Sequence, residues 1–175
     1  MRAIKVAIAD EDEGFRNALV DVLASDARLS LTGVAATAEG IVSVVAATNP
    51  DLVLLGVRAD ADGVEAALSV ERLSQGPFHD GGAAAPKTVV MSTQAKPAMV
   101  QSLLSAGASG FVLKGRMDAH LAELLVRCAR GEVLLAVSGE TYTDSGPPSG
   151  GIAGRAPDQH GEGASTWSVA RSNRG

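Results

Sequence analysis

The feature that most constrains the fold of this chain is a fivefold alternation of short apolar runs with amphipathic segments. The apolar runs occupy residues 3–9, 29–35, 51–57, 87–93 and 109–113. The segments between and after them carry apolar residues at helical spacing, as in the last one, where Leu121, Leu124, Leu125 and Cys128 follow an i, i+3, i+4, i+7 pattern. Strands that are apolar throughout and alternate with helices form a parallel sheet covered on both faces.

The residues at the ends of the helical segments support the prediction of a parallel α/β fold. Pro97 suits the first turn of the fourth helix, and Gly131 suits the position just after the last helix. Cys128 belongs to the apolar stripe of that helix, so it is expected in the core and not as a nucleophile. Right-handed crossovers then bring all five strand-to-helix loops to one edge of the sheet.

The chain divides into a domain, residues 1–137, and a tail, residues 138–175. The tail has no hydrophobic periodicity, and eight of the chain's 20 glycines lie in it together with Pro147, Pro148 and Pro157. A segment of this composition cannot bury enough apolar surface to offset its chain entropy. We therefore expect the tail to be disordered.

Composition excludes several classes of protein. The formal net charge of -5 argues against a general affinity for nucleic acid or anionic membranes. No apolar run approaches the roughly 18 residues that a membrane span requires, and the N-terminus does not resemble a signal peptide. A single cysteine excludes an internal disulfide and fits a reducing cytoplasm. The prediction is a cytoplasmic protein with no membrane partner.

Polar residues gather where the predicted strands end. Asp10, Glu11 and Asp12 follow the first strand, Ser92 ends the fourth, and Lys114 follows the fifth. Carboxylates at one edge of a sheet could hold a hard divalent cation. Each residue also has a simpler role, since Asp12 can cap the first helix and Ser92 can bond a turn.

Three stretches resemble a known family. They are "IADEDEGFRNAL", "NPDLVLLGVR" and "SAGASGFVLKG", which stand in the family's order and spacing. The domain resembles a response regulator receiver, most like those that precede LuxR/FixJ-type DNA-binding domains. The resemblance implies a flavodoxin-like (βα)5 α/β fold with a five-stranded parallel sheet.

The resemblance also implies roles for single residues. Asp10 and Glu11 are similar to the pair that binds magnesium in this family. Ser92 stands where a hydroxyl follows the phosphoryl group, Phe111 where the family keeps a switching aromatic residue, and Lys114 where it keeps its invariant lysine.

Two departures from the family bear on function. Gly56 stands at the position of the phosphate-accepting aspartate, so the nucleophile and one metal anchor are absent. Magnesium binding at Asp10 and Glu11 is therefore expected to be weak, and no cofactor is expected. Lys114 is free to pair with Asp10 or Glu11 instead. The second departure is in residues 138–175, where no helix-turn-helix can be drawn, so direct DNA binding is not expected.

Three functions from different classes are compatible with these observations. The first is a phosphorylation-independent signalling module in transcriptional or developmental regulation that contacts a protein partner, such as another regulator or a kinase, or forms a homodimer. The second is a sensor that binds a small molecule in the degenerate acidic pocket. The third, an enzyme, has the weakest support, because His79, His120 and His160 are too dispersed for a catalytic cluster.

Overall fold

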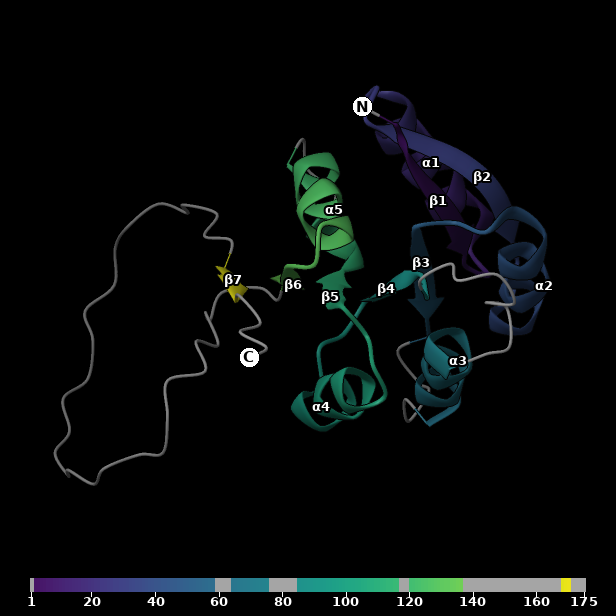
Figure 1. Ribbon diagram of the computed structural model, residues 1–175. Coiled ribbons are helices and arrows are strands. Elements are labelled where there is room, and N and C mark those ends of the chain that lie inside the picture. Colours follow the sequence, from purple (N-terminus) through teal and green to yellow (C-terminus); the bar gives the residue numbers. More distant parts are fainter. Residues whose placement is uncertain (1, 59–63, 76–84, 117–119, 137–167, 171–175) are drawn as a thin grey trace, which may run out of the picture.

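The computed structural model describes residues 2–58, 64–75, 85–116, 120–136 and 168–170. Strands and helices alternate along the chain, and the strands form one sheet in the order β2-β1-β3-β4-β5-β6-β7 (Figure 1). The strands are β1 (Ile4–Ala9), β2 (Leu29–Ala35), β3 (Leu52–Val57), β4 (Lys87–Ser92), β5 (Gly110–Leu113), β6 (Val133–Ala136) and β7 (Ser168–Ala170). The helices are α1 (Glu13–Ala24), α2 (Ala38–Thr48), α3 (Val64–Gln75), α4 (Pro97–Ser105) and α5 (Leu121–Ala129), with a 3-10 turn η1 at Lys114–Arg116. Neighbouring strands from β2 to β6 are parallel, and β7 runs antiparallel to β6.

The α/β flavodoxin-like fold and the positions of its first five strands are confirmed, but the expected number of strands is wrong. The short run Val133–Ala136 is a sixth parallel strand, with Leu134 opposite Gly110 of β5. A Cβ atom at Gly110 would lie 2.7 Å from the Leu134 carbonyl oxygen, so this glycine lets β6 come alongside β5. The run is too short to show a strand period, which is why the sequence pattern does not predict it as a strand.

The expected disorder of the tail does not hold for Ser168–Ala170. These residues pair with β6 as a seventh strand, shown in yellow beside β6 in Figure 1. The other residues of the predicted tail lie outside the described residues. Among the described parts of the chain, no helix is long and apolar enough to cross a membrane.

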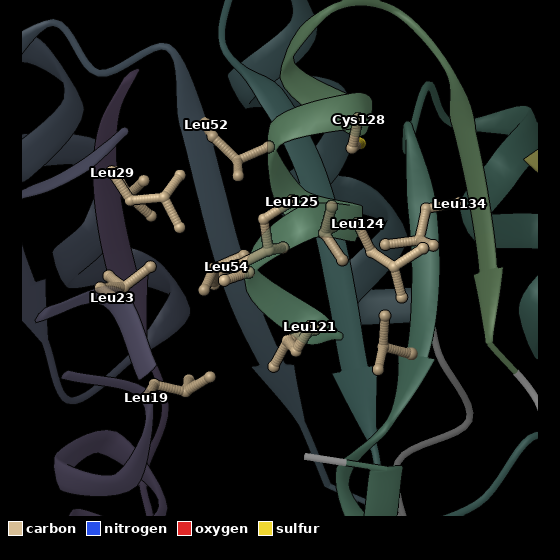
Figure 2. Packing of buried hydrophobic residues seen from close by; sticks show 14 of the residues in the cluster. Leu19, Leu23, Leu29, Leu52, Leu54, Leu121, Leu124, Leu125, Cys128 and Leu134 are labelled. Atoms are coloured by element: carbon tan, nitrogen blue, oxygen red, sulfur yellow. The ribbon is translucent and has the colours of Figure 1, made fainter. Parts of the chain in front are cut away.

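Two apolar layers enclose the sheet. On one face, Leu19 and Leu23 of α1 pack with Leu121, Leu124 and Leu125 of α5 against the inner strands (Figure 2). On the other face, the buried residues of α2, α3 and α4 form a second cluster. The sheet is thus covered on both sides, as its continuous apolar strands require.

The helices begin and end at residues that favour helix ends. The Asp12 carboxylate caps α1 by accepting a hydrogen bond from the Phe15 backbone N–H, as the sequence suggested. Pro97 occupies the first turn of α4. Gly131 has a φ of 102° just beyond α5, a left-handed conformation that glycine adopts without strain.

Cys128 is fully buried in the α5 layer, which confirms its place in the core. Burial raises the pKa of its thiol to about 12.

Candidate functional site

The carboxyl ends of the parallel strands meet at one edge, as the alternation predicted. Asp10 directly follows β1, Gly56 lies near the end of β3, and Lys114 follows β5. Parallel pairing of β1 with β3 and of β3 with β4 holds these strand ends in register. Edges of this kind are where ligands bind in open α/β sheets.

Asp10 is the buried centre of this edge. Its side chain is 3% exposed, and its Oδ1 accepts a hydrogen bond of 3.0 Å from the Asp12 backbone N–H. Its Oδ2 lies 2.6 Å from Lys114 Nζ. Among the residues that the structure describes, Oδ2 accepts no well-aligned hydrogen bond, so the contact with Lys114 is an ion pair. The predicted pairing of Lys114 with one of the two acids is present, and the acid is Asp10.

Lys114 is held from a second side. Its Nζ lies 4.6 Å from the centroid of the Phe15 ring, within range of a cation–π contact, and its side chain is only 15% exposed. The ammonium is therefore fixed between a carboxylate from the end of β1 and an aromatic face from α1. Removal of either partner would leave an uncompensated charge at this depth, which is strongly destabilising.

Gly56 provides the space that this ion pair uses. A Cβ atom built at Gly56 would lie 1.7 Å from Asp10 Oδ2 and 2.3 Å from Asp10 Cγ. Real non-bonded atoms never come so close, so the Asp10 carboxylate fills the volume in which a side chain at position 56 would begin. With Asp10 in this position, only glycine fits at position 56.

Glu11 forms an ion pair with Arg58. Its Oε2 lies 3.6 Å from Nη1 of Arg58, and both side chains are more than half exposed. Such an exposed pair contributes little stability. Arg16 donates hydrogen bonds to the backbone carbonyls of Asp10 and Glu11, which orients the turn that carries both acids.

These contacts do not suit a magnesium ion. Lys114 and the Asp12 N–H occupy the two oxygens of Asp10, Glu11 is turned toward Arg58, and Gly56 offers no side chain. Within the described ranges, no group of three or more acidic, histidine or cysteine residues could hold a metal. A hard cation needs several oxygen ligands at once, and this arrangement does not supply them.

Ser92 and Phe111 are both fully buried. Ser92 is fully buried at the end of β4, and its Oγ accepts a long hydrogen bond of 3.4 Å from the Gln94 N–H. Phe111 is fully buried in the layer beneath α2, α3 and α4. The acids of the following loop, Asp60 and Asp62, lie outside the described residues.

An open pocket of about 290 Å³ adjoins the ion pair. Asp10, Gly56 and Lys114 line it together with Glu11 and Arg58. Its remaining walls come from the segment that begins α2, residues 36–39, from the end of β3, and from Glu65 and Ala66 of α3. The sequence pattern did not predict that residues 36–39, Glu65 and Ala66 belong to this site. The one available signal was that residues 36–39 follow the second strand, whose carboxyl end lies at the same edge.

Comparison with known proteins agrees with the fold. The family model of the response regulator receiver domain matches residues 6–126, more than half of the chain. The DNA-binding transcriptional activator DevR/DosR of Mycobacterium tuberculosis is 32% identical over 133 residues, which cover 75% of this chain and 57% of that protein. The probable transcriptional regulatory protein NarL of the same species is 25% identical over 136 residues, which cover 77% of this chain and 59% of that protein. The matches thus span less than two thirds of the length of these curated relatives.

Solved structures support the same fold. The receiver domain of the putative response regulator NarL from Mycobacterium tuberculosis has a TM-score of 0.62 at 23% identity and covers 75% of this chain and 99% of that one. The isolated receiver domain of RcsB from Salmonella enterica serovar Typhimurium, in the presence of BeF3-, has a TM-score of 0.63 at 14% identity. The match covers 77% of this chain and 94% of that one. At these identities the likeness concerns the fold alone. With the family model matching most of the described domain, the chain belongs to the response regulator receiver domain family, whose members are signalling modules of two-component systems.

Proposed function

We propose that this chain is a phosphorylation-independent receiver module that signals through protein–protein contacts in transcriptional or developmental regulation. The observation that carries the proposal is the position of the Asp10 carboxylate, which fills the space above Gly56 and pairs with Lys114. The ion pair supplies from within the chain a negative charge beside Lys114 that an acyl phosphate would otherwise supply.

The chemistry of phosphorylation supports this proposal. Transfer to an aspartate requires a carboxylate oxygen in line with the donor phosphorus and a cation that neutralises the developing charge. Gly56 presents only backbone, and the Asp10 carboxylate is buried, with Oδ1 in a hydrogen bond to the Asp12 N–H and Oδ2 in an ion pair with Lys114. In this proposal Asp10 and Glu11 are a vestigial metal pair, and Ser92, Phe111 and Lys114 are vestigial switch residues.

The partner in this proposal is a protein, either another regulator, a kinase or a second copy of the chain. The curated relatives are named as transcriptional regulators, and one is named as DNA-binding. In this proposal the receiver domain itself contacts a protein and not DNA.

The experiment is phosphotransfer from acetyl phosphate in the presence of magnesium, followed by intact-mass measurement. The expected result is no increase in mass, while a receiver domain with an intact acceptor aspartate, treated in parallel, gains one phosphoryl group. A phosphoryl group on this chain that maps to Asp10, or to another acid of the strand-end edge, would overturn the proposal.

A second candidate function is a small-molecule sensor, and the open pocket beside the ion pair favours it. Its volume of about 290 Å³ lies at the lower limit of ordinary ligand sites. Native mass spectrometry of the chain purified from its own cells distinguishes the candidates. A retained small molecule that is released by Glu39→Ala or Glu65→Ala, two substitutions in the pocket wall, supports the sensor. The bare mass of the chain supports the first proposal.

A further inference from the structure

The two outer edges of the sheet are protected in different ways. An exposed edge strand presents unpaired backbone groups that can pair with another chain, and proteins commonly protect such edges with bulges or covering segments. Here β2 forms one edge, and β6 would form the other if β7 were not paired to it.

The β2 edge carries a bulge. Val6 of β1 lies opposite Leu31, but the next residue, Ala7, lies opposite Gly33, so Thr32 is an extra residue. The Thr32 hydroxyl donates a hydrogen bond of 3.2 Å to the Val6 carbonyl and holds the bulge in place. A bulge bends and twists the strand, which hinders regular pairing with a second chain.

The β6 edge has no bulge in its pairing with either neighbour. The Leu134 N–H donates to the Ser109 carbonyl, toward β5. Because backbone groups alternate in direction along a strand, the N–H and C=O groups of Val133 and Leu135 point to the opposite side, where β7 lies. Leu135 is opposite Ser168, and Val133 is opposite Ala170. The tail strand therefore satisfies the backbone groups that β6 would otherwise expose.

We propose that the segment Ser168–Ala170 is an intramolecular cover that prevents β6 from pairing with β6 of a second copy of this chain. The occupant of the uncovered edge is the second copy, because two identical strands that pair antiparallel are related by a two-fold axis and form a closed, symmetric dimer. The same antiparallel geometry is the one that β6 already accepts from β7. This regulation of self-association does not depend on how the acidic edge functions.

The cover is weak enough to be displaced. Only three residue pairs join β7 to β6, and residues 137–167 separate the two strands along the chain. The entropy of closing that connection opposes the few hydrogen bonds that the pairing gains. Short edge strands of this kind open locally at a small fraction of the global unfolding free energy.

Two proline substitutions in β7 of the full chain test the proposal. Ala170 lies opposite Val133, whose backbone groups point toward β7, so Ala170→Pro removes a donor to β6. Val169 lies opposite Leu134, whose backbone groups point toward β5, so Val169→Pro removes an N–H that points away from β6 and serves as the matched control. Sedimentation equilibrium over a range of concentrations is expected to show Ala170→Pro dimerising at least about tenfold more tightly than the parent chain, because a tethered competitor has been removed. Val169→Pro is expected to match the parent.

A further variant separates edge pairing from misfolding. Leu135→Pro, combined with Ala170→Pro, removes an outward N–H of β6 and is expected to abolish the dimer while the circular dichroism spectrum is retained. Hydrogen exchange of the Leu135 amide at low concentration is expected to be faster in Ala170→Pro than in Val169→Pro. The proposal is overturned if Ala170→Pro associates no more tightly than Val169→Pro, or if the dimer persists with Leu135→Pro.

Discussion

The contact between Asp10 and the space above Gly56 makes a specific prediction for Gly56→Ala. The added methyl group would lie 1.7 Å from Asp10 Oδ2, so the carboxylate has to rotate away from Lys114. This is a larger perturbation than a methyl group usually causes, because the displaced atom belongs to a buried ion pair and not to a flexible apolar chain.

The magnitude follows from two terms. Overpacking of a filled interior costs about 1–3 kcal/mol. Loss of a hydrogen bond or close contact to a charged group costs about 1.5–3 kcal/mol. The terms overlap, because rotation of Asp10 relieves part of the packing strain, and so we expect a loss of about 2–4 kcal/mol in the free energy of unfolding. For a chain of this size, that corresponds to a fall in Tm on the order of 5–15 °C.

The assay is thermal and urea unfolding of the parent chain, Gly56→Ala and a matched control. Gly115→Ala is the control, because a Cβ atom at Gly115, next to Lys114, would meet no atom within 4 Å. It is expected to change the Tm by no more than about 1 °C. In the background of Asp10→Ala, the effect of Gly56→Ala is expected to fall by about half or more, since the two sites are in contact and their energies are not additive.

The reasoning is refuted if Gly56→Ala is as stable as Gly115→Ala. It is also refuted if the cost of Gly56→Ala is the same with and without the Asp10 carboxylate. The first result would mean that Asp10 does not occupy the space above Gly56, and the second that the strain arises elsewhere.

Three further predictions concern Gly56, Cys128 and Asp26. Gly56→Asp should lower the Tm without metal, because the new side chain displaces Asp10, and magnesium should recover part of the loss by binding the added carboxylate; equal Tm values with and without magnesium would contradict this. The Cys128 thiol, whose pKa burial raises to about 12, should not react with a thiol reagent at pH 8 until the chain is unfolded, and rapid labelling of the native protein would contradict its burial. Hydrogen bonds from Arg28 lower the pKa of Asp26 from 3.8 to about 2, so this carboxylate stabilises the fold above about pH 4 and loses that effect as the pH falls toward 2. Asp26→Asn should therefore be less stable than the parent at pH 6, and the difference, measured by urea unfolding, should shrink steadily below pH 4.

Much of the fold could be predicted from the sequence, because its elements carry strong periodic signals. The strands from β1 to β4 have six or seven residues each and are apolar, β5 is short but stands in the regular alternation with the helices, and α5 has a regular stripe that is followed by Gly131. The strands β6 and β7 could not be predicted, since three or four residues carry no usable period and their pairing depends on neighbours distant in the sequence.

Part of the candidate site could also be predicted from the sequence, and part of it could not. That Lys114 would meet a carboxylate follows from the topology, because parallel strand ends share one edge. Which carboxylate it meets depends on the side-chain rotamer of Asp10, and that rotamer is selected by the missing Cβ at Gly56 and by the N–H of Asp12. Such a choice arises from three-dimensional packing, so it could not be read from the order of residues.

The pairing of Asp10 with Lys114 has a consequence for how such a protein could convey information. A module that switches between two states reports on its environment through the fraction of molecules in each state. If an internal ion pair holds every molecule in one state at the acidic edge, that fraction is constant there, and the number of molecules per cell becomes the variable that sets how much partner is bound. Binding to a partner then follows mass action alone, so a tenfold change in copy number alters occupancy as much as a free-energy change of about 1.4 kcal/mol in affinity. Under the proposed function, synthesis and degradation of the chain would take the place of a kinase as the source of the signal.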